Sequence, residues 1–155
     1  MITANLNSLQ LLEGWFRSDP ATRQKTAFPL YKSTGTESMS VVYFEIEPGN
    51  SLGTHSDSAE EIILILEGEA EASIEEEIAL LNKGEMAVIP KMKLHNIRNI
   101  GSGPLKVAGF FASALVESTF TEPLMPIVQQ TVGTPPVNSP SPMAWNEIFK
   151  IITGS

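Results

Sequence analysis

Two histidines and two carboxylates stand at the starts of segments that are predicted to be β-strands. His55 and Asp57 lie two residues apart, and Glu61 comes directly before the aliphatic residues 62–66. The other histidine of the chain, His95, lies in an alternating segment further on. Side chains two residues apart project from the same face of a strand, so we expect His55 and Asp57 to point toward one centre.

Glu61 is expected inside the fold because it opens a strand that is apolar on both faces. A carboxylate buried alone is costly, and a nearby cation or a set of hydrogen bonds removes that cost. Imidazoles and carboxylates are ligands for Fe, Mn, Ni, Co and Zn, and the chain has no cysteine that could add a thiolate. The candidate ligands of a divalent transition metal are therefore His55, Asp57, Glu61 and His95. A spare carboxylate such as Asp57 is also a candidate catalytic residue, acting as a general base.

Simpler interpretations stand beside the metal site. A histidine inside a barrel can hydrogen-bond to the backbone or to a carboxylate without binding metal. The short side chain of Asp57 can instead accept a hydrogen bond from its own loop. Glu60 is expected to face solvent, because neighbouring strand residues alternate in direction. Asn99 is expected to hydrogen-bond within the fold rather than to ligate, because amides bind transition metals less well than imidazoles.

Short β-type segments separated by turn residues fill the middle of the chain, from about residue 25 to 116. Gly, Pro, Asn and Ser are frequent in the breaks, and the segments recur at roughly 8 to 12 residues without a helical pattern between them. This arrangement is typical of an all-β sandwich or barrel. Residues 5–16 differ, because the helical spacing of their leucines predicts a short N-terminal amphipathic helix that ends near Gly14.

Residues 117–155 change in character, because many prolines fall there and disfavour regular β ladders. We expect a Pro-rich C-terminal arm that leads to a helix, with Ser141 as its cap and Pro142 in its first turn. The apolar face of this helix would consist of Trp145, Ile148, Phe149 and Ile152. With no internal repeat, residues 1–155 are interpreted as a single domain.

Composition limits the class of partner. The 155 residues carry a net charge of −8, from 10 basic and 18 acidic side chains, which disfavours nucleic acid as a partner. The first residues lack the basic flank and apolar core of a signal peptide, and the apolar runs are far shorter than the ~20 residues that cross a bilayer. We expect a soluble, cytoplasmic protein without a membrane partner.

The segment around the first candidates resembles the first motif of the cupin family. That motif has Gly, five residues, His, one residue, His, three or four residues, Glu, six residues and Gly. The corresponding positions here hold Gly49, His55, Asp57, Glu61 and Gly68. Asp57 therefore replaces the second histidine of the motif.

A second segment resembles the other cupin motif, which has Gly, five residues, Pro, one residue, Gly, two residues, His, three residues and Asn. The corresponding positions here hold Gly84, Pro90, Met92, His95 and Asn99. Met92 replaces the motif glycine, so the turn before His95 is expected to lack easy left-handed geometry.

The resemblance covers about residues 40–112 and implies a cupin-type double-stranded β-helix, or jelly-roll barrel. The usual cupin ligands are three histidines and one glutamate, so the implied set here is His55, Glu61 and His95. Asp57 leaves three alternatives. In the first, Asp57 binds the metal, which then has two negatively charged ligands. In the second, Asp57 turns away, and two histidines and one carboxylate bind the metal and leave open coordination positions. In the third alternative no metal binds, and the cavity holds a small organic molecule or nothing.

The resemblance implies several functions, because cupins with one fold serve many reactions. The first hypothesis is a metal-dependent, dioxygenase-like oxidoreductase acting on a small organic molecule. The alternatives are a non-catalytic small-molecule binding or sensing module, and an isomerase or epimerase. Cupins commonly pair through their outer sheets, and the apolar strand and terminal helix favour a homodimer.

Overall fold

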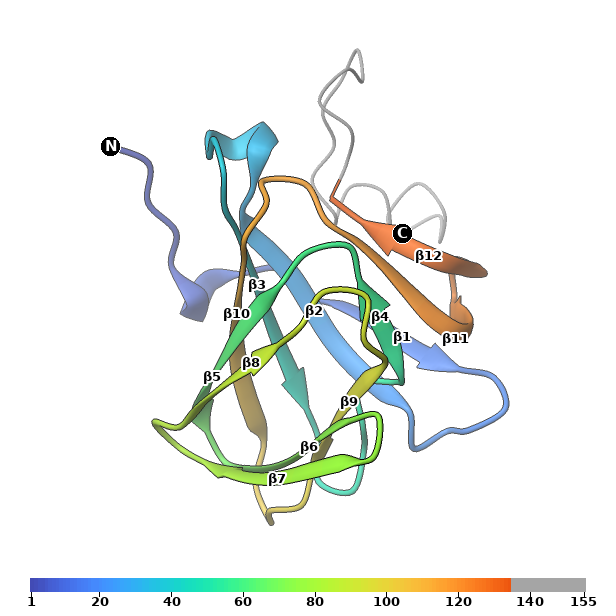
Figure 1. Ribbon diagram of the computed structural model, residues 1–155. Coiled ribbons are helices and arrows are strands. Elements are labelled where there is room, and N and C mark those ends of the chain that lie inside the picture. The colour runs from blue at the N-terminus through green and yellow to red at the C-terminus, as the bar shows by residue number, and fades with distance from the viewer. Residues whose placement is uncertain (135–155) are drawn as a thin grey trace.

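The computed structural model describes residues 1–134, which form an all-β structure with two 3-10 turns (Figure 1). The turns are η1 (Leu6–Ser8) and η2 (Lys32–Thr34). The strands are β1 (Leu12–Phe16), β2 (Arg23–Leu30), β3 (Ser40–Ile46), β4 (His55–Asp57), β5 (Glu61–Glu67), β6 (Glu69–Ile74), β7 (Glu77–Asn82), β8 (Met86–Ile89), β9 (His95–Asn99), β10 (Leu105–Phe111), β11 (Glu117–Met125) and β12 (Gln129–Gly133).

All strands join one antiparallel sheet that curls into a nearly closed barrel. The order of neighbours is β7-β6-β9-β4-β11-β1-β2-β3-β10-β5-β8, and β12 pairs with β11. The strands at the two ends of this order, β7 and β8, come from the middle of the chain, and β11, β1 and β2 from the two terminal regions lie between them. This arrangement confirms the predicted all-β jelly roll.

The barrel interior is filled by side chains that alternate along the strands. In β5 the side chains of Glu61, Ile63 and Ile65 point inward and are almost fully buried. Ile62, between them, faces outward and keeps 42% of its surface exposed. The strand that is apolar on both faces is thus covered completely on one face only. Its start carries Glu61 into the interior, as the sequence predicts.

The predicted N-terminal helix over residues 5–16 is wrong. The described chain forms only η1 there, and β1 follows as a strand with alternating burial. Long-range strand pairing outweighs the helical spacing of the leucines, because β1 forms hydrogen-bonded ladders with β2 on one side and with β11 on the other. Leu12 and Phe16 reach the interior through this alternation, whereas Leu6 and Leu9 stay half-buried.

The predicted Pro-rich arm is wrong for residues 117–134, which form the hairpin β11–β12. Pro123 is tolerated because the β11–β12 register shifts between Thr119 and Leu124, where a missing N–H breaks no ladder bond. The turn of the hairpin contains a cis peptide bond between Met125 and Pro126. The predicted helix with Trp145, Ile148, Phe149 and Ile152 lies outside the described residues.

Met92 adopts a left-handed backbone with φ of 64° although it is not glycine. Its amide donates a hydrogen bond of 2.8 Å to the carbonyl oxygen of Asp57, which ties the turn before β9 to the end of β4. The turn is left-handed even without the motif glycine, because the tertiary contact supports the strained residue. Gly68 has a stricter requirement, because a Cβ there would lie 2.7 Å from the carbonyl oxygen of Pro104.

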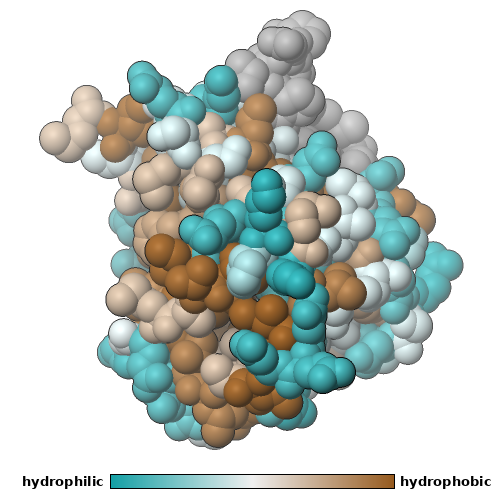
Figure 2. Space-filling view, in the orientation of Figure 1, coloured by the Kyte–Doolittle hydropathy of each residue, from teal (hydrophilic) through white to brown (hydrophobic). Residues whose placement is uncertain are grey.

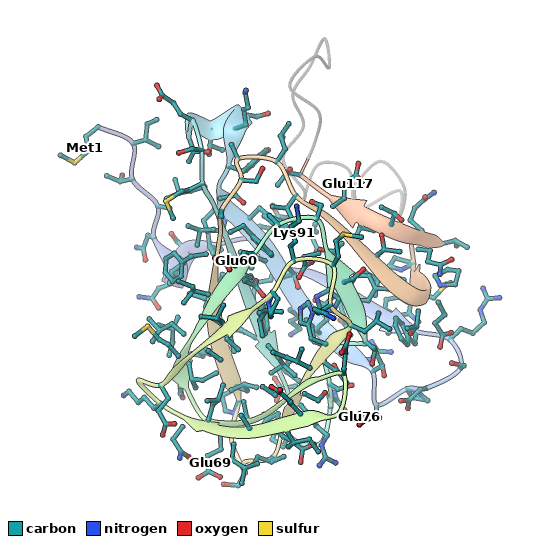
Figure 3. All side chains as sticks on the ribbon, in the orientation of Figure 1. Met1, Glu60, Glu69, Glu76, Lys91 and Glu117 are labelled. Carbon is teal, nitrogen blue, oxygen red and sulfur yellow. The ribbon has the colours of Figure 1, made fainter. Side chains whose placement is uncertain are left out.

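Hydrophobic side chains gather on the face of the molecule that Figure 2 shows, over β5, β7 and β8. The exposed members are Ile62, Ile78, Leu80, Met86 and Val88. The expected homodimer would use an uncharged surface of this kind, and it stays a prediction. At the β6–β7 hairpin, acidic side chains such as Glu69 and Glu76 point outward instead (Figure 3). No helix in residues 1–134 has the length and apolarity that a membrane span requires.

Candidate metal centre

Two strands bring three of the candidate ligands together inside the barrel. His55 and Asp57 lie on the same face of β4, and β9 pairs with β4 so that His95 stands directly opposite His55. The two imidazole rings have their centroids 4.2 Å apart. One ligand atom from each of His55, Asp57 and His95 falls within 4.8 Å of the others, and all three residues are buried. The predicted convergence of these side chains is therefore confirmed.

The three facing atoms are the Nε2 atoms of the two histidines and one oxygen of Asp57. His95 Nε2 lies 3.1 Å from Asp57 Oδ2, and His55 Nε2 lies 3.5 Å from the same oxygen. Among the described residues, Asp57 Oδ2 and His95 Nε2 have no aligned hydrogen bond, although both are fully buried. Buried polar atoms are nearly always satisfied, so this unpaired pair indicates a missing partner.

The opposite ring nitrogens fix the tautomer of each histidine. His55 Nδ1 lies 2.7 Å from the carbonyl oxygen of Gly53, and His95 Nδ1 lies 2.9 Å from that of Lys93. A carbonyl oxygen only accepts, so both Nδ1 atoms carry the proton and donate it. In the neutral imidazoles both Nε2 atoms then direct lone pairs toward Asp57 Oδ2. Lone pairs on all three facing atoms suit a cation between them, and a backbone carbonyl on the far nitrogen is typical of metal-binding histidines.

The carboxylate of Asp57 is held by a residue outside the predicted site. Ser118, on β11 directly opposite Asp57, donates its hydroxyl hydrogen to Oδ1 over 2.5 Å. This bond leaves Oδ2 to face the histidines. Burial raises the pKa of Asp57, but when His55 and His95 are protonated, their hydrogen bonds and positive charges outweigh burial and hold the pKa well below its usual range. Asp57 is therefore an anion at neutral pH.

Glu61 lies beside this group but is not one of its three members. It is 4% exposed and lines the same cavity as His55 and Asp57. Burial, reinforced by the charge of Asp57, raises the pKa of Glu61 well above its usual range. Its side chain fits because Gly109 on β10 has none: a Cβ there would collide with Glu61 Oε2 and lie 2.7 Å from Val42 Cγ1. Ligation by all four predicted residues stays a prediction.

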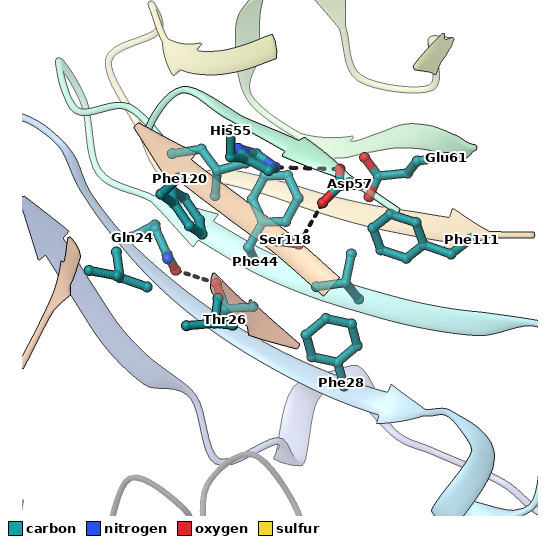
Figure 4. A pocket seen from close by; sticks show the side chains of 14 residues that line it. Gln24, Thr26, Phe28, Phe44, His55, Asp57, Glu61, Phe111, Ser118 and Phe120 are labelled. Carbon is teal, nitrogen blue, oxygen red and sulfur yellow. Dashed lines mark hydrogen bonds and ion pairs between the residues drawn. The ribbon is translucent and has the colours of Figure 1, made fainter. Parts of the chain in front are cut away.

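A cavity of about 50 Å³ adjoins the group (Figure 4). Besides His55, Asp57 and Glu61, its lining residues are Gln24, Thr26, Phe28, Val42, Phe44, Leu52, Phe111, Ser118, Phe120, Leu124 and Val132. A water molecule occupies about 30 Å³ in the liquid, so the enclosed space suits a small group of atoms. Phe120 stacks on the ring of His55, with the centroids 4.7 Å apart, and shields one side of the site.

The residues that β2 and β11 contribute to this cavity were not predicted from the sequence. Gln24, Thr26 and Phe28 alternate along β2 and share its inner face. Ser118 and Phe120 alternate in the same way along β11. The alternation of Ser118 and Phe120 can be read from the sequence, but the neighbouring prolines led to the prediction of an arm instead of a strand.

The remaining predicted residues have structural positions. Asn99 is buried, and its amide nitrogen donates hydrogen bonds of 2.8 Å to the carbonyl oxygens of Ile46 and Gly103. Its side-chain oxygen accepts from the Gly101 amide at 2.9 Å. Glu60 is exposed. Both expectations, a structural Asn99 and a solvent-facing Glu60, are confirmed.

The sequence and fold match known proteins. Residues 42–111 match the family model described as Cupin domain. A cupin 2 domain-containing protein from Halorhodospira halophila superposes with a TM-score of 0.52 at 21% identity, over 57% of this chain and 62% of that one. The polyketide cyclase RemF from Streptomyces resistomycificus gives 0.58 at 16% identity, over 72% of this chain and 78% of that one.

Oxalate decarboxylase from Lactobacillus farciminis, in a formate complex, gives a TM-score of 0.64 at 21% identity. The match covers 75% of this chain but 34% of that one, so this chain corresponds to about a third of the enzyme. No curated protein matches the sequence. At these identities the solved structures show a shared fold, and residues 42–111 carry the family's sequence pattern. Residues 42–111 therefore form a cupin domain.

Proposed function

We propose that the chain binds a divalent transition metal through His55, Asp57 and His95 and acts on a small organic molecule in the adjoining cavity. The observation that carries the proposal is the convergence of two imidazole Nε2 atoms on one carboxylate oxygen, with both Nδ1 atoms turned to backbone carbonyl oxygens. Nitrogen and oxygen ligands of this kind suit Fe, Mn, Ni, Co and Zn.

A metal bound there would polarise an oxygen-bearing substrate or activate oxygen. The residues of the chain prepare the site for it. The carbonyl oxygens of Gly53 and Lys93 hold the rings in one tautomer, and Ser118 holds one oxygen of Asp57. The phenylalanine rings of the cavity keep bulk water from the ligand atoms.

The two carboxyl groups suit different tasks. The lowered pKa of Asp57 makes it a good anionic ligand and a weak base. The raised pKa of Glu61 lets that carboxyl group keep a proton beside the site and deliver it to a substrate. The general-base role predicted for Asp57 stays a prediction, and Glu61 is the stronger candidate for proton transfer.

Among metal-dependent reactions, a dioxygenase-like oxidation stays our first proposal. The superpositions support a broad range, because the similar structures include a decarboxylase and a cyclase. A non-catalytic binding or sensing module is the second candidate, and the small apolar cavity beside the ligand atoms favours it. An isomerase or epimerase is less favoured, because, of the ionisable residues that line the cavity, only Glu61 stands outside the ligand set, and a separate acid and base would need two.

Metal content tests the proposal directly. We expect elemental analysis of freshly purified protein to find a transition metal, and calorimetric titration with Co²⁺ to give one site per chain. His95→Ala should weaken Co²⁺ binding by more than about 100-fold, the upper range for losing a mere supporting residue. Arg98→Ala is the matched control, because Arg98 is exposed on the same strand and its side chain forms an ion pair with Glu71, away from the site.

Equal Co²⁺ affinity in the wild type and His95→Ala would overturn the proposed site. Oxygen uptake by the iron-loaded protein separates the two candidate functions. Uptake with phenolic or diketone compounds supports the oxidoreductase, whereas ligand binding without turnover supports the binding module.

A further inference from the structure

The cavity beside the metal centre combines an apolar wall with two acidic groups and one histidine. Of its lining residues, all in the described part of the chain, none is lysine or arginine. The ionisable ones are His55, Asp57 and Glu61, which already belong to the site. Phe28, Phe44, Phe111 and Phe120 supply most of the aromatic surface. An anionic group placed away from the metal would therefore meet no compensating charge.

One polar pair lies in the wall away from the ligand atoms. Thr26 donates its hydroxyl hydrogen to the side-chain oxygen of Gln24, and both residues line the cavity. Figure 4 shows this pair on β2, with phenylalanine rings between it and Asp57 and Glu61. Because the pair is uncharged, it can hydrogen-bond to a hydroxyl or carbonyl group but cannot neutralise a carboxylate.

From these observations we infer that the ligand of this cavity has one oxygen-bearing or anionic head group, directed at the metal, and an uncharged, apolar body. The inference rests on the proposed function, because the metal must accept the head group. A second carboxylate in the wall would be buried among phenylalanine rings without a cation, which is strongly unfavourable. Dicarboxylates that hold their second carboxylate away from the metal are thereby disfavoured, although an oxalate decarboxylase shares the fold.

Two acids of equal size test the charge rule. Isovalerate and malonate share one carboxylate and differ only because an isopropyl group replaces the second carboxylate. Calorimetric titration of Co²⁺-loaded protein should show isovalerate binding at least about 10-fold more tightly than malonate. Equilibrium dialysis checks that Co²⁺ stays on the protein, and titration of each acid into Co²⁺ buffer gives the blank.

A variant that adds a positive charge to the cavity wall provides a second test. Thr26→Lys places a cation in the wall and should shift the preference toward malonate. Thr26→Met adds similar length without charge and should keep the preference for isovalerate. The wild-type comparison decides the inference if Thr26→Lys does not fold.

Tighter or equal binding of malonate by the Co²⁺-loaded wild type overturns the inference, as does the failure of both acids to bind. Either result leaves the metal site intact, because Co²⁺ binding is measured before any acid is added. Absence of Co²⁺ binding overturns the proposed function itself, and this inference with it.

Discussion

Two regions of the chain build the candidate site. One supplies the candidate ligands, and the other supplies many of the side chains that line the cavity. His55, Asp57, Glu61 and His95 all lie within residues 42–111, the segment that matches the cupin model. The flanking strands β1, β2, β11 and β12 lie outside it. Cavity residues from these flanks are Gln24, Thr26, Phe28, Ser118, Phe120, Leu124 and Val132. The matched core therefore supplies the ionisable side chains of the site, whereas the flanks supply much of the cavity wall.

The flanks are also part of the site's support. β11 pairs with β4, so Ser118 stands opposite Asp57 and Phe120 stands opposite His55. The same strand pairs with β1 and thereby links the two flanks to each other. A cupin core with other flanking strands would keep its ligand positions and lose these two contacts.

The largest expected effect lies in a flank. Phe120 is 5% exposed, stacks on His55 and packs edge-on against Phe16 with the centroids 6.0 Å apart. Phe120→Ala should lower the free energy of unfolding by about 3–5 kcal/mol, because a large cavity remains. Phe110→Ala, in the matched core but half-buried on the outer face, should cost clearly less. Urea unfolding measures the free energy of unfolding of both variants. A larger decrease for Phe110→Ala than for Phe120→Ala would contradict the importance of the flank for stability.

A smaller effect is expected from one methyl group in the core. Gly109→Ala forces a Cβ against Glu61 and Val42, and overpacking of this kind costs about 1–3 kcal/mol of the free energy of unfolding. Gly103→Ala is the control, because nothing lies within 4 Å of a Cβ at that position. Equal unfolding midpoints in urea would show that Glu61 does not need the space at Gly109.

Ser118→Ala tests whether a flank orients a core ligand. Without the hydroxyl, Asp57 Oδ1 loses its hydrogen bond, and Co²⁺ affinity should fall about 10-fold. Ser118→Thr keeps the hydroxyl and should restore most of the affinity. Thr119→Ala removes an exposed hydroxyl that hydrogen-bonds to Thr131, away from the site, and it should leave the affinity unchanged. If Ser118→Ala binds as tightly as the wild type, Ser118 has no role in the site.

The smallest effect concerns the pH dependence of the metal-free protein. Glu61 has a raised pKa in the folded state, so the folded chain keeps a proton that the unfolded chain releases above the ordinary Glu range. Stability should therefore fall as the pH rises from that range toward the folded pKa. Glu61→Gln removes this loss, and its unfolding free energy should decline less than that of the wild type between about pH 5 and pH 8.

Glu60→Gln is the neighbouring control for this measurement, because Glu60 is exposed. Parallel urea-unfolding curves for the wild type and Glu61→Gln across the pH range would contradict the raised pKa. The metal must be removed beforehand, since a bound cation would favour the ionised carboxylate.

The core was more predictable than the flanks for a physical reason. The positions of His55, Asp57 and Glu61 follow from strand alternation and from a short turn, which are local properties. The helix expected over residues 5–16 failed because β1 is held by partners far away in the chain. The arm expected after Val116 failed because a register shift accommodates Pro123 inside a strand. Met92 took its left-handed turn because its amide reaches Asp57.

The sequence by itself determined the all-β class, the cupin resemblance, and the pairing of two histidines with buried carboxylates, because residue type and spacing carry that information. The tertiary structure alone decided that Asp57 turns one oxygen toward both imidazoles, that Glu61 stands slightly apart, and that β2 and β11 complete the cavity. These outcomes depend on which distant strands pair, and no local pattern contains the geometry of a closed sheet.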